Sequence, residues 1–259
     1  MAPRGARAPM TSPEARLIVT ADDLGLQGDV DAGIVRAASG GIVTHASWLA
    51  GGESADAAPG LVAREAPDLG VGLHLSLSQT RPSGDPRPLA GLLRPDGRFP
   101  DRQFAAIRWA WRRQRLGAIW DEWRAQADAF ERAWGRTPTH LDSHQHVHLA
   151  PMLGPLAVRL AVERWIPRLR APVGPARGLE ARVFVALGAR LRRRARSAGL
   201  TVPDRFDGFE HSGRLDRQKL SDMSAALGPG LTEWMAHPGM TDEPSGYARR
   251  QEMEALLAV

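Results

Sequence analysis

The chain has 259 residues, 43% of them hydrophobic and 24% charged, which is enough to bury the core of one large domain or of two smaller ones. The absence of cysteine excludes disulfides and thiolate metal ligands, and no apolar run is long enough to span a bilayer. The formal net charge of +5 comes almost entirely from arginine, with Lys219 the single lysine. We interpret this skew as a coding bias and predict no nucleic-acid partner.

The predicted elements alternate between strands and helices after an N-terminal tail. Residues 1–15 are rich in Ala, Pro and Arg and lack a secretory apolar segment, so we expect a disordered tail and a cytoplasmic protein. Alternation with a period of two predicts a strand at 71–77, and apolar residues at steps of three and four predict one helix at 116–134. Residues 81–100 hold five prolines and are expected to form a loop. Further strands are expected at 16–20, 42–49, 139–142, 166–171, 205–209 and 231–236, and further helices at 29–39, 152–164, 178–198, 215–227 and 246–258.

About seven βα units in this order predict an α/β fold whose parallel strands close into a barrel. Polar motifs lie at or near the ends of four expected strands: the pair Asp22-Asp23, then His74, the block 142–148 and His237. The carboxyl ends of barrel strands converge on one face, where catalytic residues gather. We therefore expect these four motifs to form one site.

Residues 140–148 hold half of the eight histidines of the chain, together with Asp142. Neutral imidazole is the commonest metal ligand in proteins, and a neighbouring carboxylate can fix its tautomer and orientation. The block therefore predicts a metal site. A structural interpretation remains open for single members, because Asp22-Asp23 can cap the turn that follows them and His74 can be a core histidine.

Two histidines and one carboxylate leave open positions on a metal ion, which suits metal-assisted hydrolysis. A second carboxylate can then accept a proton from water, and a separate imidazole can assist the leaving group. Adjacent residues that leave a strand point to opposite sides, so Asp22 and Asp23 can take different roles. The chain has no Gly-x-Ser-x-Gly turn and no cysteine, which argues against a covalent acyl-enzyme.

Four segments resemble the YdjC-like carbohydrate deacetylases (the ChbG/HpnK family): residues 20–25, 72–75, 139–148 and 233–239. The block Asp-Ser-His-Gln-His-Val-His from Asp142 to His148 is the most specific of them. The resemblance implies a distorted TIM-like (β/α) barrel, a single deacetylase domain over 16–259. It also implies removal of N-acetyl groups from amino sugars with one divalent metal ion, for which we expect Mg²⁺ or Zn²⁺.

Carried over by position, the resemblance implies that Asp23, His74 and His144 bind the metal and that Asp22 is the general base. His237 is then the general acid or a group that stabilises the oxyanion. The roles of Asp22 and Asp23 could be exchanged. The residues expected to line the substrate or orient the ligands are Asp142, His146, His148 and Glu233.

The substrate stays open at this point between two branches of the resembling family. One deacetylates soluble chitin-derived disaccharides, to which the 142–148 block looks closer, and the other acts on an N-acetylglucosaminyl hopanoid lipid. Trp109 and Trp111 lie beside several arginines and suggest an interface, either a peripheral contact with the inner membrane or a homodimer. Two other classes are kept as alternatives: a metal-dependent phosphoesterase and a barrel that binds sugar without cleaving it.

Overall fold

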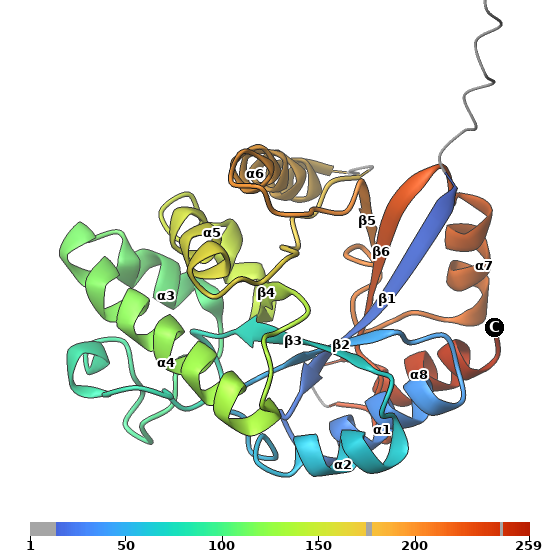
Figure 1. Ribbon diagram of the computed structural model, residues 1–259, viewed down its shortest axis with the longest axis horizontal. Coiled ribbons are helices and arrows are strands. Elements are labelled where there is room, and N and C mark those ends of the chain that lie inside the picture. Colours follow the sequence, from blue (N-terminus) through green and yellow to red (C-terminus); the bar gives the residue numbers. More distant parts are fainter. Residues whose placement is uncertain (1–13, 175–177, 244–245) are drawn as a thin grey trace, which may run out of the picture.

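Six parallel strands form one sheet in the order β4-β3-β2-β1-β6-β5, and helices surround it (Figure 1). The computed structural model describes residues 14–174, 178–243 and 246–259. The tail expected at 1–15 therefore lies outside the described residues as far as residue 13. The strands are β1 Ala15–Leu24, β2 His45–Trp48, β3 Gly70–Leu75, β4 Leu141–Ser143, β5 Arg205–Asp207 and β6 Gly230–Ala236. The helices are α1 Gly28–Ser39, α2 Ala58–Glu65, α3 Gln103–Ala110, α4 Leu116–Trp134, α5 Gly154–Glu163, α6 Gly178–Ser197, α7 Arg217–Ala225 and α8 Arg249–Leu257.

The strand expected at 166–171 is an irregular segment that lies between β4 and β5. Leu169 forms a parallel bridge with Leu141 of β4, and the Phe206 N–H of β5 donates to the Val173 carbonyl at 2.8 Å. Pro167 and Pro172 have no N–H to give to a neighbouring strand, which explains why the segment forms bridges and no regular ladder. With this segment the sheet becomes a distorted barrel, and the predicted fold class is confirmed.

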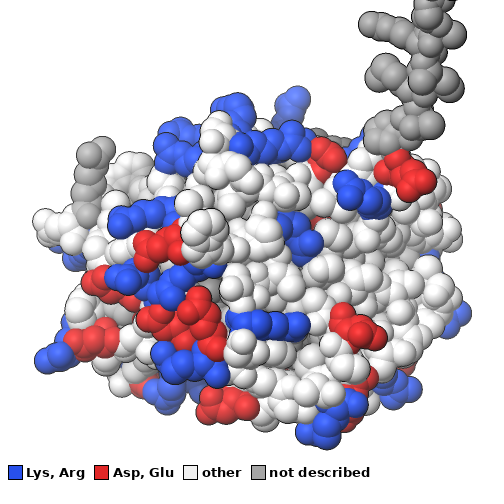
Figure 2. Space-filling view, in the orientation of Figure 1, with Lys and Arg blue, Asp and Glu red and all other residues white. Residues whose placement is uncertain are grey.

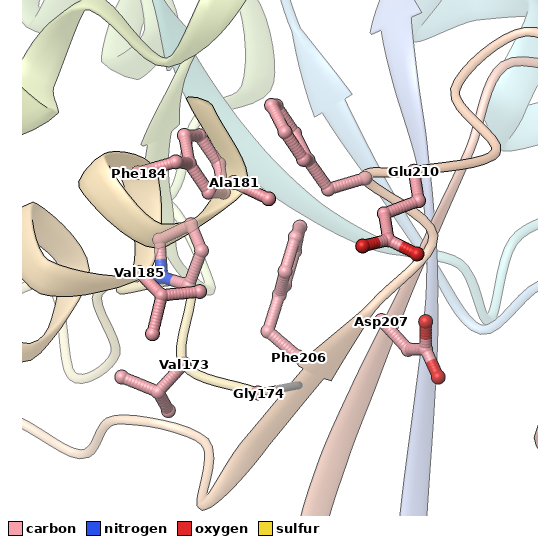
Figure 3. A pocket seen from close by; sticks show the side chains of 10 residues that line it. Val173, Gly174, Ala181, Phe184, Val185, Phe206, Asp207 and Glu210 are labelled. Carbon is pink, nitrogen blue, oxygen red and sulfur yellow. The ribbon is translucent and has the colours of Figure 1, made fainter. Parts of the chain in front are cut away.

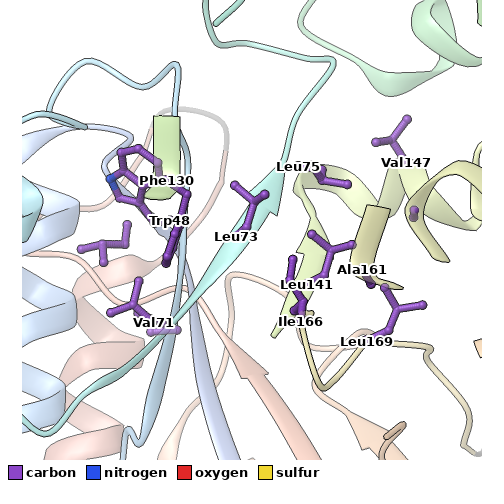
Figure 4. Packing of buried hydrophobic residues seen from close by; sticks show 14 of the residues in the cluster. Trp48, Val71, Leu73, Leu75, Phe130, Leu141, Val147, Ala161, Ile166 and Leu169 are labelled. Carbon is purple, nitrogen blue, oxygen red and sulfur yellow. The ribbon is translucent and has the colours of Figure 1, made fainter. Parts of the chain in front are cut away.

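Alternate residues of the strands face two different environments. Val71, Leu73 and Leu75 of β3 pack in the apolar layer between the sheet and the helices, where Trp48 and Phe130 also lie (Figure 4). The residues between them, such as His74, face the barrel interior, whose buried side chains are largely polar. A strand period of two thus separates an apolar shell from a polar interior.

The helices expected at 29–39, 116–134, 152–164, 178–198, 215–227 and 246–258 are all present within a few residues of the expected ends. Two further helices, α2 and α3, were not expected. Both have eight residues and follow stretches rich in glycine, proline or polar residues. Each helix is too short for its apolar periodicity to stand out in the sequence. In the described part of the chain, no helix is both long and apolar enough to cross a membrane.

Candidate active site

The ends of β1, β3, β4 and β6 bring the polar motifs of the sequence to one pocket of about 950 Å³. Its wall also includes residues of the loop after β3, of α3 and of the segment before α8. The sequence-predicted residues that line it are Asp22, Asp23, His74, His144, His146 and His237. The convergence expected from a barrel is therefore present, and all six side chains come from the strand ends or the turns that follow them.

A bulge at the end of β1 sets the directions of the two adjacent aspartates. The pairing register with β2 shifts between Ala21 and Leu24, and Asp23 has a φ of +76°. A bulge re-aims a side chain that strict alternation would send to the other face, and aspartate tolerates a positive φ better than most residues. Both carboxylates consequently face the same site, since Asp22 and Asp23 lie 4.0 and 3.7 Å from His74 Nε2.

His74 is held by the carboxylate behind it. Its Nδ1 donates to Asp142 Oδ1 at 2.6 Å, and Asp142 Oδ2 accepts from Ser47 Oγ at 2.7 Å. Burial opposes protonation, but Asp142 and Asp22 outweigh it and raise the pKa of the His74 imidazole. The unshared nitrogen Nε2 points at Asp23, which is the arrangement of a carboxylate-oriented metal ligand.

His144 is held in the same way by an amide. Its Nε2 lies 2.6 Å from Gln79 Oε1, an atom that can only accept, so Nε2 carries the proton and Nδ1 is left with its lone pair. That Nδ1 lies 2.8 Å from Asp23 Oδ1, which accepts no hydrogen bond within the described residues. Two electron-rich atoms at this distance need a cation or a proton between them.

Asp23, His74 and His144 thus fit a divalent cation. Their ligand atoms lie within 4.8 Å of one another and all three residues are buried. A second group, Asp22 with His74 and Asp142, meets the same distance criterion but fits less well. Its carboxylates already bind other partners, because Asp22 is bidentate to Arg170 and Asp142 accepts from His74 and Arg170.

Arg170 organises the acidic groups of the barrel interior. It donates to both oxygens of Asp22 at 2.7 and 2.8 Å, and it forms ion pairs with Asp142 at 2.9 Å and Glu233 at 2.8 Å. Its side chain is fully buried, and although burial alone would lower the pKa of the guanidinium, the three carboxylates raise it well above its usual range. One guanidinium therefore pairs with three buried carboxylates.

His237 follows β6 and faces the pocket with a free ring nitrogen. Its Nδ1 has no hydrogen-bond partner among the described residues, and its ring packs against Tyr247 at a centroid distance of 5.0 Å. Burial lowers the pKa of His237 to about 4, so the imidazole is neutral near pH 7. The His237 backbone N–H donates to Glu252, and burial raises the pKa of that carboxyl to about 7.

His146 lies at the border of the pocket, in an aromatic cluster. Its ring contacts those of Phe184, Phe206 and Phe209 at centroid distances of 5.0 to 5.9 Å. These phenylalanines also line a smaller cavity of about 40 Å³ (Figure 3). His146 has a φ of +54°, an uncommon value for a side-chain-bearing residue, and such strain is often found at functional sites.

The other predicted residues lie behind the pocket wall. His148 Nε2 is 2.9 Å from the Arg170 carbonyl, and Glu233 bonds the Arg170 guanidinium and Thr20. Asp142 supports His74, as described above. All three are buried and hold Arg170 or His74 in place, and none lines the pocket.

Several polar residues of the site gave no signal in the sequence. Arg170 falls within the expected strand 166–171, but one arginine in so arginine-rich a chain does not stand out. Arg249 donates to Asp23 Oδ2 at 2.7 Å from α8, and Gln79 reaches His144 from a loop. These contacts join residues far apart in the chain, so spacing alone could not reveal them.

The chain is similar to several known proteins over most of its length. A profile of the family described as YdjC-like protein matches residues 16–258. A carbohydrate deacetylase of Mus musculus is 35% identical over 91% of this chain and 81% of its own length. A chitooligosaccharide deacetylase of Enterobacter sp. (strain 638) is 34% identical over 93% of this chain and 90% of its own length. A crystal structure described as a putative cellobiose-phosphate cleavage protein from Enterococcus faecalis V583 is similar with a TM-score of 0.73 and 27% identity, covering 94% of this chain and 90% of that one.

Proposed function

The chain belongs to the YdjC-like family, and from this premise we propose that it is a metal-dependent hydrolase that removes N-acetyl groups from N-acetylated amino sugars. Similar proteins named carbohydrate deacetylase and chitooligosaccharide deacetylase support this activity. One observation carries the proposal. Asp23, His74 and His144 present electron-rich atoms to one point in the pocket, and Asp22 and His237 line the same pocket.

A divalent ion, Mg²⁺ or Zn²⁺, would be held by Asp23, His74 and His144. When bound, such an ion supplies Lewis-acid chemistry, polarising an amide carbonyl and acidifying water. The chain itself orients the ligands, through Asp142 behind His74 and Gln79 behind His144. By occupying one ring nitrogen of each histidine, Asp142 and Gln79 leave the other nitrogen available for the ion.

Asp22 would take a proton from the attacking water and return it to the departing amine, so that water and amide give acetate and a free amino sugar. Arg170 holds both of its oxygens, which keeps the carboxylate in one orientation. His237 would act as a neutral hydrogen-bond donor to the carbonyl oxygen as charge develops there, because the pKa of this imidazole, about 4, leaves it uncharged near pH 7.

Acetate release from a chitin-derived disaccharide tests the proposal. We expect release by the chain loaded with Zn²⁺ or Mg²⁺, loss after chelation and recovery when metal is returned. Asp22→Asn should retain metal and lose at least about 10²-fold in turnover, the lower range for loss of a general base. His144→Ala should lose metal and turnover together, whereas His45→Gln, a substitution of a histidine outside the pocket, should change neither.

Equal turnover of Asp22→Asn and the unaltered chain would contradict the assignment of the base and favour the exchanged roles of Asp22 and Asp23. Release of phosphate from a phosphorylated disaccharide, with no acetate release, would favour a phosphoesterase. Binding of the disaccharide without release of either product would favour a sugar-binding barrel.

The N-acetylglucosaminyl hopanoid is the second substrate candidate, and it carries the same acetamide on a lipid. The same acetate assay with this glycolipid decides between the two. The observation that favours it is an exposed aromatic residue on the pocket rim, Phe104.

A further inference from the structure

Helix α3 starts at the rim of the pocket and exposes an aromatic stripe. Its inner face is formed by Ala106, Trp109 and Ala110, all buried. On the opposite face, Phe104 is 70% exposed and Trp111, which directly follows the helix, is 73% exposed. Seven residues apart on helical backbone, these two side chains lie on the same side, separated by about 10 Å along the axis.

The sequence suggested an interface at Trp109 and Trp111, and the structure exposes only Trp111 of these two. Trp109 is 8% exposed, and the Arg115 guanidinium lies 4.8 Å from its ring centroid. The steps of three and four between Ala106, Trp109 and Ala110 put Trp109 on the inner face of α3. Phe104 replaces it as the second exposed aromatic residue.

The exposed face of α3 is also positively charged. Between Asp101 and Asp121 the chain has no acidic residue. The arginines of this stretch are Arg102, Arg108, Arg112, Arg113 and Arg115. Arg102, Arg108 and Arg112 are exposed, and no described acidic residue forms an ion pair with any of them. Their charge is therefore available to an external partner.

The start of α3 is fixed to the turn that follows β4. The Gln103 N–H donates to Gln145 Oε1 at 2.9 Å, and Gln145 Nε2 donates to the Asp101 carbonyl at the same distance. Gln145 directly follows His144, and both Arg102 and Phe104 line the pocket. An external surface to which α3 binds would therefore lie beside the pocket entrance.

We infer that the Phe104–Trp111 face of α3 docks this protein on an anionic lipid surface. Exposed aromatic rings beside arginines are the composition of helices that lie in the interface of a membrane, with the rings at headgroup depth and the guanidinium groups against lipid phosphates. A neutral sugar polymer would use the rings but would gain nothing from the unpaired arginines. The inference is independent of the proposed chemistry, because docking can be measured without turnover.

Sedimentation of the full chain with vesicles tests the inference. We expect binding to phosphatidylcholine mixed with phosphatidylglycerol, weakened by salt, and little binding to phosphatidylcholine alone. Arg108→Gln with Arg112→Gln should weaken binding by at least about tenfold, since each arginine at an anionic surface contributes about fivefold. Trp111→Ser should weaken it as well, and spin-labelled lipid should quench less fluorescence in this variant than in the unaltered chain.

Two matched controls use exposed residues elsewhere. Arginines also gather over α6 (Figure 2), so Arg193→Gln with Arg194→Gln removes the same charge from another face. Trp165, 87% exposed after α5, supplies the aromatic control Trp165→Ser. Both control variants should retain vesicle binding. Thermal unfolding checks that every variant is folded.

Three results would overturn the inference. The first is no binding to the mixed vesicles, and the second is an equal loss of binding in the α6 control, which would indicate unspecific attraction by net charge. The third is a homodimer in sedimentation velocity that Trp111→Ser dissociates, which would make this face an interface between two copies. If the first result came with a higher KM for chitin oligomers in Trp111→Ser, the face would be identified as a sugar-binding platform instead.

Discussion

The apolar shell and the polar interior of this barrel are built from alternate residues of the same strands, yet they are stabilised in different ways. In the shell, Trp48 and Phe130 pack edge to face with ring centroids 5.7 Å apart. Other apolar side chains of similar volume could replace them with a modest loss of stability. In the interior, Arg170 pairs with three carboxylates at once, a geometry that no other natural side chain can supply. Stability in the shell depends on volume, and in the interior on charge balance.

This difference also separates folding from function. Barrels of this kind are commonly filled by branched apolar side chains, whereas here Thr20, Ser47, His140 and Asp142 occupy buried interior positions. Gly72 allows this packing, because a Cβ at that position would lie 2.4 Å from the His140 ring. The interior network supports the candidate metal ligands from below, at the cost of burying charge.

Replacing Arg170 by methionine should have the largest effect. Arg170→Met leaves Asp22, Asp142 and Glu233 buried without their cation, which should lower the free energy of unfolding by about 3–5 kcal/mol. It should also abolish most turnover, because Asp22 loses the group that orients it. Urea unfolding and acetate release measure the two effects. A loss of less than about 1 kcal/mol would show that the interior does not depend on this charge balance.

Phe130→Ala is the matching change in the shell. Removing a buried phenylalanine from an aromatic cluster should cost about 3–5 kcal/mol in the free energy of unfolding. Because Phe130 belongs to α4 and lies outside the pocket, kcat of the folded fraction should stay near that of the unaltered chain. A large fall in kcat at a temperature where the variant is fully folded would break the separation between shell and interior.

The shell is the part of the fold that the sequence predicts well. The helix at 116–134 is present over the expected residues, because its buried side chains Ile119, Trp123, Ala127 and Phe130 recur at helical spacing. The strand at 166–171 failed as a regular strand because Pro167 and Pro172 interrupt its hydrogen bonding. The spacing of buried residues can be recognised in the sequence. The hydrogen-bond pairing between strands depends on tertiary contacts and cannot be recognised there.

The sequence predicts only part of the candidate active site. The sequence placed Asp22, Asp23, His74, His144 and His237 at strand ends, and the structure brings them to one pocket, while their roles stay predictions. Alternation could not foresee the bulge that turns Asp23 toward Asp22. The partners that support the site come from distant segments, and their residue types carry no distinctive pattern.

Glu252 tests the boundary between the two regions through pH. Burial raises its pKa from 4.5 to about 7, so the folded state holds a proton that the unfolded state releases above pH 4.5. The contribution of Glu252 to stability should therefore be greatest below pH 4.5 and should fall as the pH rises toward 7, by a total on the order of 3 kcal/mol.

Urea unfolding of the unaltered chain and of Glu252→Gln between pH 5 and 8 measures this contribution. The difference in the free energy of unfolding between them should shift in favour of the variant as the pH rises. Asp222→Asn, at an exposed position of α7, serves as the control and should show no such trend. A difference that stays constant with pH would mean that Glu252 is ionised throughout this range.

The smallest effect is expected at the edge of the polar network, where Gln79 fixes the ring of His144. Gln79→Ala removes the acceptor that lies 2.6 Å from His144 Nε2. Without it, neither the orientation of the ring nor the position of its proton is fixed. Loss of such a supporting group should weaken metal binding by about 10–100-fold, measured by calorimetric titration of Zn²⁺. Gln79→Glu keeps an acceptor opposite Nε2 and should restore most of the affinity.

Gln145→Ala is the matched control, since Gln145 also has a positive φ at the pocket but bonds the start of α3. Unchanged Zn²⁺ affinity in Gln79→Ala would show that His144 binds the ion without support from Gln79.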